Sequence, residues 1–175
     1  DLMSHYGTVT IDRGEMHGVK KGMGTMTING VVGYITNVEA NSSKILLLTD
    51  RYAVVDGVVQ RSRARGIVQG NIDTYTLTFL KRSDDIQVND MIVTSGLDNY
   101  FPKGFAIGTV SKVVKNEYGL GQDVVIQPSV VAANLAALFV VLNANNFNFE
   151  NLEKQNAEAA GKEVSSQAGK KIESR

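Results

Sequence analysis

Short runs of β-branched and aromatic residues, separated by turn residues, recur through most of the chain. In the run 74–80, TYTLTFL, threonines alternate with Tyr75, Leu77 and Phe79. This period of two is typical of a strand with one polar face and one buried apolar face. Short strands at this spacing indicate an all-β sandwich or barrel. Further strands are predicted over 8–11, 24–28, 31–38, 44–48, 53–59, 66–70, 91–95, 105–114, 123–128 and 138–142.

The dipeptide Asn29-Gly30 lies between two of these runs and is a strong short-range hairpin signal. A two-residue hairpin turn needs positive φ at both central residues, which Asn and Gly tolerate best. Residues 24–38 are therefore predicted to form a β-hairpin.

Two glycine-led strands, GYITNV (33–38) and GTVSKV (108–113), share the pattern G-x-[IV]-x-x-V. This faint repeat suggests two related β units of roughly 60–70 residues, a size at which mutual packing helps to stabilise each core.

The predicted join between the two units is the segment RSRARG (61–66). Arg61, Arg63 and Arg65 alternate, so on an extended chain they would share one side. We interpret the segment as a solvated crossover between the units; the alternative is a patch that binds anions or nucleic acid.

The composition changes at Asn143. The residues that follow are mostly polar, and after Leu152 only Val164 and Ile172 are apolar and larger than alanine. Such a segment buries too little surface to offset the entropy of ordering. Residues 144–175 are therefore predicted to form a disordered tail.

Charge and composition exclude several kinds of chemistry. The chain has 18 Lys+Arg and 18 Asp+Glu, and this balance disfavours a nucleic-acid partner, which usually needs a basic excess. With no cysteine and two histidines, disulfides and the usual thiolate or histidine metal sites are excluded, and no cofactor is expected. No run reaches the ~20 apolar residues of a membrane helix. The opening residues read as the middle of a longer protein.

His17, Asp50 and Ser95 occur in the chain order of the two-barrel serine proteases. Their surroundings argue against catalysis. Val93 and Thr94 precede Ser95, so Gly96 is the only glycine beside it, whereas a nucleophile elbow needs exposed backbone N–H groups around the serine. Asp50 ends a strand and is expected to cap a turn through its own backbone. A divergent protease is kept as an alternative function.

Four segments closely resemble the extracytoplasmic region of the MreC family of bacterial rod-shape-determining proteins. They are IDRGEMHGVKKGM (11–23), GVVGYITNVEANSSKILLLTD (30–50), NDMIVTSGLDNYFPKGFAIGTVSKV (89–113) and IQPSVVAANLAALFVVL (126–142). One departure is Asn89-Asp90, where Gly-Asp is usual in the family. Asn tolerates the left-handed region, so we expect the turn to be kept.

The resemblance implies a fold of two packed small β-barrels, arranged as in chymotrypsin-like proteases but without a catalytic triad. The first barrel would comprise residues 1–65 plus 129–143, because the last strand is expected to return to it. The second barrel would comprise residues 66–128, and the tail 144–175 lies outside the resemblance.

The resemblance also implies a function. The chain would belong to a non-enzymatic scaffold of the elongasome, which maintains rod shape and regulates lateral peptidoglycan synthesis. Expected partners are the class B penicillin-binding transpeptidase, MreD, RodA and MreB, together with further copies of the chain in dimers or filaments. The module would lie at the periplasmic face of the inner membrane, anchored by a membrane span that precedes this sequence.

Aromatic side chains in loops are favoured anchors of protein interfaces. On that ground a partner-binding role is predicted for Tyr100, Phe101, Phe105, Tyr118 and Leu120. The alternative for Phe101 and Phe105 is that they tuck under their loop and plug the barrel, since large apolar side chains are usually buried.

Overall fold

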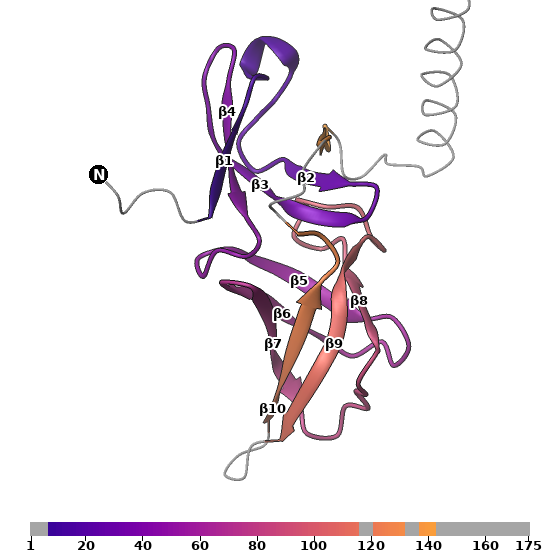
Figure 1. Cartoon of the computed structure of the whole chain (residues 1–175). Helices are drawn as coiled ribbons and strands as arrows, with labels where there is room; N and C mark the ends of the chain where they lie inside the picture. The colour runs from indigo at the N-terminus through magenta and orange to yellow at the C-terminus, as the bar shows by residue number, and fades with distance from the viewer. Residues whose placement is uncertain (1–6, 116–120, 132–136, 143–175) are drawn as a thin grey trace, which may run out of the picture. The chain divides into compact units, whose positions relative to one another are not determined.

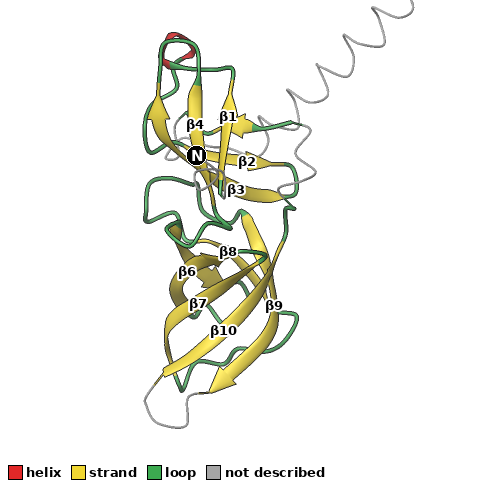
Figure 2. Cartoon of the chain, turned by 60° about the vertical axis from the view of Figure 1, so that its left-hand side comes forward, coloured by secondary structure: helices red, strands yellow, loops and turns green. Residues whose placement is uncertain are grey.

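The computed structural model describes residues 7–115, 121–131 and 137–142, and this part of the chain is all-β apart from the short 3-10 helix η1 (Glu15–His17). Its strands form two sheets, one open and one closed into a barrel (Figures 1 and 2). The prediction of an all-β fold is confirmed.

The open sheet has five antiparallel strands in the order β1-β4-β3-β2-β11. The two-residue strand β11, from the far end of the described chain, pairs with β2 through Phe139–Met26 and Val140–Thr25. The last strand therefore joins the first sheet, where the family resemblance expects it. The strands are β1 (Thr8–Ile11), β2 (Gly24–Thr27), β3 (Gly30–Val38), β4 (Ser43–Leu47) and β11 (Phe139–Val140).

The prediction that this first unit is a closed barrel is wrong. Within the described residues β1 pairs only with β4 and β11 only with β2, so these two strands are the edges of the sheet. Closure requires each strand to be paired on both sides. At four and two residues, β1 and β11 offer few backbone groups with which to close the sheet.

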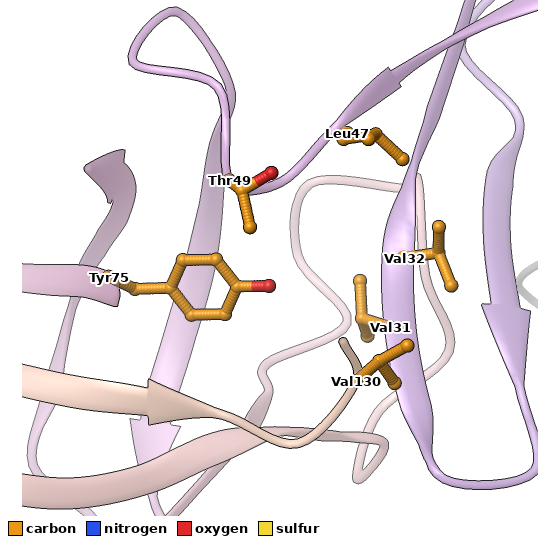
Figure 3. A pocket seen from close by; sticks show the side chains of 6 residues that line it. All are labelled: Val31, Val32, Leu47, Thr49, Tyr75 and Val130. Atoms are coloured by element: carbon orange, nitrogen blue, oxygen red, sulfur yellow. The ribbon is translucent and has the colours of Figure 1, made fainter. Parts of the chain in front are cut away.

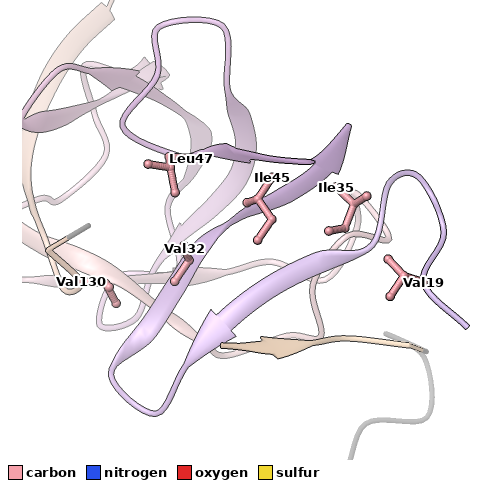
Figure 4. Packing of buried hydrophobic residues seen from close by; sticks show 6 residues of the cluster. All are labelled: Val19, Val32, Ile35, Ile45, Leu47 and Val130. Carbon is pink, nitrogen blue, oxygen red and sulfur yellow. The ribbon is translucent and has the colours of Figure 1, made fainter. Parts of the chain in front are cut away.

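The core of the open sheet is a small apolar cluster (Figure 4). Most of its members come from β3 and β4, but one lies just after the barrel strand β10 and another just before β2. The cluster therefore ties distant parts of the chain to one sheet. Its buried members are Val19, Val32, Ile35, Ile45, Leu47 and Val130.

The closed barrel has six antiparallel strands in the order β10-β7-β6-β5-β8-β9. Its interior is filled by apolar side chains such as Leu77, Ile92 and Ile126, each fully buried. Such a barrel is a packed core and not a channel. The strands are β5 (Val54–Val59), β6 (Arg65–Asn71), β7 (Thr74–Lys81), β8 (Met91–Thr94), β9 (Ala106–Lys115) and β10 (Gly121–Pro128).

Strand pairing does not follow the boundary predicted at residue 65. The segment after β5 is a hairpin turn: the Val59 N–H donates to the Ala64 carbonyl at 2.8 Å, and Arg63 has φ 63°. The turn pairs β5 with β6, so β5 belongs to the barrel, and the crossover predicted at 61–66 is wrong. The predicted assignment of 1–65 plus 129–143 and of 66–128 to two domains otherwise stays a prediction, and the tail 144–175 lies outside the described residues.

The hairpin predicted over residues 24–38 is confirmed as β2 and β3. Its turn lies one residue earlier than expected, with Thr27 paired to Gly30 and only Gly30 of the predicted pair at positive φ, 147°. Gly30 has a second role, because a Cβ there would overlap the carbonyl oxygen of Ala106 in β9. The absence of a side chain at this position lets the open sheet approach the barrel.

Arg61 joins the β5–β6 turn to the start of β8. Its Nε and Nη2 donate to the two carboxylate oxygens of Asp90 at 2.7 and 2.8 Å, and it also pairs with Asp85. Asp90 is 8% exposed and also accepts the Gln87 N–H. The neighbouring Asn89 has φ 74°, which confirms that this turn keeps a left-handed residue. The Arg61 guanidinium holds the pKa of Asp90 below its usual range.

We expect Asp90→Asn to lower stability at neutral pH and to flatten its acid dependence. Because the pKa of Asp90 is lower in the folded state than in the unfolded state, its contribution is present above the unfolded pKa and is lost as pH falls through the folded pKa. Urea unfolding of both proteins at several pH values, with Asp73→Asn at an exposed turn as control, measures the difference. Equal acid dependence in wild type and Asp90→Asn would contradict this role.

Candidate interaction surface

The loop from Ser95 to Phe105 (the 95–105 loop), which connects β8 to β9, is fixed at its base by Thr94. This fully buried side chain donates from Oγ1 to the Pro102 carbonyl and accepts the Phe105 N–H at 2.9 Å. The Thr94 backbone adds bonds to Phe105 and Gly104 at 2.8 and 2.9 Å. The two ends of the loop are therefore held together.

Asp98 attaches the middle of the loop to the barrel. Its carboxylate accepts the N–H of Tyr100 at 3.1 Å and the N–H of Asp56, in β5, at 3.2 Å. Burial raises the pKa of Asp98 despite these bonds. The carboxylate holds the loop through main-chain donors, as short acidic side chains commonly do in turns.

The tip of the loop packs against the open sheet. The Gly24 N–H donates to the Tyr100 carbonyl at 3.1 Å, and a Cβ on Gly24 would overlap that carbonyl oxygen and the Phe101 ring. The Tyr100 ring stacks on Tyr34 of β3, with centroids 4.9 Å apart and 10° between the planes. A segment that begins and ends in the barrel is thereby built into the first sheet.

The aromatics predicted to bind a partner mostly serve this packing. Phe101 is 0% exposed and Phe105 is buried, as the alternative of rings tucked under the loop expects, and a partner-binding role for either stays a prediction. Tyr100 is half-buried against Tyr34. Tyr118 and Leu120 lie outside the described residues. The residue type at Gly24 is the one feature of the sequence that could have indicated a close contact at this position. Nothing in the sequence indicates that the 95–105 loop makes that contact.

The three residues of the protease alternative are not brought together. His17 Nδ1 accepts the Gly14 N–H at 3.2 Å, and Asp50 Oδ1 accepts the N–H two residues on at 2.8 Å. Ser95 Oγ accepts the Leu97 N–H at 3.2 Å. Each side chain caps its own turn, and none of the three is hydrogen-bonded to another in the described structure.

The arginines of the alternative anion patch do not lie on an extended chain, which that alternative assumed. Arg61 is neutralised by Asp85 and Asp90, Arg63 lies in a left-handed turn, and Arg65 begins β6. The described ranges also contain no group of three or more acidic, histidine or cysteine side chains that could hold a metal ion.

A small cavity lies where the open sheet meets the barrel (Figure 3). Its volume is about 10 Å³, close to the room that a single water needs. The Tyr75 hydroxyl points toward it, and burial raises the pKa of Tyr75 to about 12. This is a packing gap, too small for a ligand. It is lined by Val31, Val32, Leu47, Thr49, Tyr75 and Val130.

The outer face of the barrel carries an exposed aromatic that the sequence placed inside. The alternation predicted for β7 holds as far as Leu77, but Phe79 is 81% exposed and the next residue, Leu80, is buried. In the pairing with β10, Leu77 faces Val124 and Leu80 faces Gln122, so two residues of β7 oppose one of β10. This β-bulge, with Phe79 at φ 61°, turns the ring outward.

A shallow groove of about 320 Å³ runs beside Phe79 across β5, β6 and β7. Its floor includes the backbone of Gly57 and Gly66, which face each other in neighbouring strands. Arg65 and Asp56 lie along it, and the described residues provide no ion-pair partner for either. We call this the Phe79 groove; its lining is Asp56, Gly57, Arg65, Gly66, Ile67 and Phe79.

Comparison with known proteins identifies the family. The family described as "Rod shape-determining protein MreC, barrel core" matches residues 1–142. The chain belongs to the MreC family. MreC is a non-enzymatic cell-shape protein, so the protease alternative is wrong.

The curated relatives are MreC proteins of diverse bacteria. The chain is 37% identical over 107 residues to the cell shape-determining protein MreC of Escherichia coli, covering 60% of this chain and 29% of that protein. It is 36% identical over 126 residues to MreC of Listeria monocytogenes, covering 69% of this chain and 43% of that protein. The chain thus spans less than half the length of either relative.

Solved MreC structures share the fold. MreC of Listeria monocytogenes superposes with a TM-score of 0.75 at 31% identity, covering 82% of this chain and 71% of that one. A Helicobacter pylori MreC, solved in complex with penicillin-binding protein PBP2, shares the fold at 19% identity with a TM-score of 0.66, covering 82% and 91% of the two chains. No helix among the described residues is long and apolar enough to cross a membrane.

We expect Gly24→Ala to lower the free energy of unfolding by about 1–3 kcal/mol, because the added methyl group overpacks the site against Tyr100 and Phe101. Gly121→Ala is the matched control: among the described residues its Cβ would meet nothing nearer than the Leu80 carbonyl oxygen at 3.6 Å. Urea unfolding compares the two. Similar stabilities for both variants would contradict the close packing of the loop on Gly24.

Proposed function

We propose that this chain is the periplasmic core of a cell-shape scaffold, which binds the class B penicillin-binding transpeptidase and regulates lateral peptidoglycan synthesis by that contact alone. The observation that carries the proposal is the family match over residues 1–142. A scaffold that only binds an enzyme acts on it by favouring one of its conformations.

The transpeptidase partner is supported by the Helicobacter pylori complex of MreC with PBP2. Because the fold match covers 91% of that MreC chain, almost all of the fold present in that complex has a counterpart here. A periplasmic location is supported by a further solved relative, described as the major periplasmic domain of the cell shape-determining filament MreC, at 24% identity and a TM-score of 0.64.

The longer protein would complete the assembly. We propose MreD, RodA and MreB as its other partners, with self-association into dimers or filaments, and a membrane anchor outside this sequence. The proposed regulation needs no cofactor. A ligand shifts the population of its partner's conformations when one of those conformations makes better contacts with the ligand than the others do.

We expect the purified chain to bind the extracytoplasmic region of its cognate class B transpeptidase, measured by biolayer interferometry with an unrelated periplasmic domain as control. We also expect a serine-directed fluorophosphonate probe to leave the chain unlabelled. Failure to bind under conditions in which both proteins are folded would contradict the proposed function, and labelling that disappears in Ser95→Ala would contradict the non-enzymatic assignment.

A further inference from the structure

We propose that the Phe79 groove is the surface on which the transpeptidase docks, by placing an apolar side chain against the Phe79 ring and opposite charges beside Arg65 and Asp56. This inference rests on the proposed function and goes further, because it locates the contact on the outer face of strands β5, β6 and β7.

The backbone at Phe79 is held in a conformation that its residue type disfavours. Two of the positive-φ residues, Ile72 and Phe79, are bulky and apolar, and both have φ 61°. Left-handed backbone is unfavourable for such residues, and such strain persists where the surrounding structure imposes it, often at binding sites. A strained backbone that exposes a phenyl ring lowers stability twice, and Phe79, unlike Ile72, also lines the groove.

The bulge has a definite geometric effect. Without it, the period of two would place Phe79 inside the barrel with Tyr75 and Leu77. With it, Leu80 takes the inward position and Phe79 turns out to 81% exposure. Bulges commonly re-aim a side chain in this way next to functional sites.

The strands beside Phe79 leave room for a partner side chain. The middle of the groove is backbone, because Gly57 and Gly66 line it and a Cβ on either would point into the barrel interior, toward Leu77. An apolar group inserted there would cover the ring and displace water from both walls. Aromatic residues beside such a pocket are the anchors that dominate binding in protein interfaces.

The rim of the groove carries charge of both signs. Arg65 is exposed at the start of β6, whereas Asp56 lies in β5, where its N–H donates to the Asp98 carboxylate. A docking segment with an acidic group toward Arg65 and a basic group toward Asp56 would match this rim, and complementary charges set register and speed encounter.

The small apolar area of the groove favours a regulated partner over a second copy of this chain. Stable interfaces bury roughly 800 Å² on each side, and only Phe79 and Ile67 contribute apolar side chains here. A transient contact that adjusts an enzyme needs less area than a permanent dimer. We therefore assign the transpeptidase as the occupant.

The decisive comparison is Phe79→Asn against Ile72→Asn in transpeptidase binding. Both replace an exposed apolar residue at φ 61° on the β6–β7 hairpin with asparagine, which tolerates that backbone, but only Phe79 lines the groove. We expect Phe79→Asn to weaken binding at least about tenfold and to melt no lower than wild type. We expect Ile72→Asn to bind within about twofold of wild type.

A second variant keeps the proposal testable if Phe79→Asn fails to fold. Arg65→Glu should weaken binding and reverse or reduce its dependence on salt, because it changes the charge at the rim. Unchanged affinity in the folded variants would overturn the groove assignment.

Two further outcomes are distinguishable. If wild type binds and Phe79→Asn binds equally well, only the groove assignment fails; if wild type does not bind, the proposed function fails with it. Sedimentation of the chain alone tests the other occupant: a wild-type dimer that Phe79→Asn dissociates would overturn the transpeptidase in favour of a second copy.

Discussion

The packing of the 95–105 loop on Gly24 is the contact on which the described structure depends. The loop leaves and re-enters the barrel, yet its carbonyl at Tyr100 bonds to the open sheet and its Phe101 ring fills the space that Gly24 leaves empty. Neither sheet is large enough to bury much surface alone, and small units of this kind gain stability by sharing a core. Val130, which follows β10 but belongs to the core of the open sheet, makes the same connection from another strand.

This arrangement leaves no room for an active site where the two sheets meet in the described part of the chain. In a protease, the junction between the barrels holds the nucleophile and its base. Here Phe101 and a pair of stacked tyrosines fill the junction, and the cavity that remains has room for about one water. His17, Asp50 and Ser95 each bond within their own turns. The part of the molecule that a partner can contact is its surface. Phe79, an exposed aromatic residue with a left-handed backbone, lies on the outer face of the barrel.

Local patterns in the sequence predicted local structure well. The alternation from Thr74 to Leu77, the hairpin signal near Gly30 and the left-handed turn at Asn89 all depend on a few neighbouring residues, and all were confirmed. Features set by distant partners were predicted badly. The partner of β5 depends on whether RSRARG turns or crosses over, and the bulge at Phe79 depends on the register of β10, some forty residues away. The family motifs supplied the return of β11 to the first sheet, which no periodicity could show.

Native-state hydrogen exchange at the Gly24 amide tests the role of the 95–105 loop most directly. This N–H is bonded to the Tyr100 carbonyl, whereas the Val110 N–H, bonded to the Asp90 carbonyl, reports on the barrel. If the loop joins sheet and barrel into one cooperative unit, both amides will exchange with the same opening free energy and the same dependence on urea. Exchange of Gly24 at a much lower opening free energy, with Val110 still protected, would contradict the account.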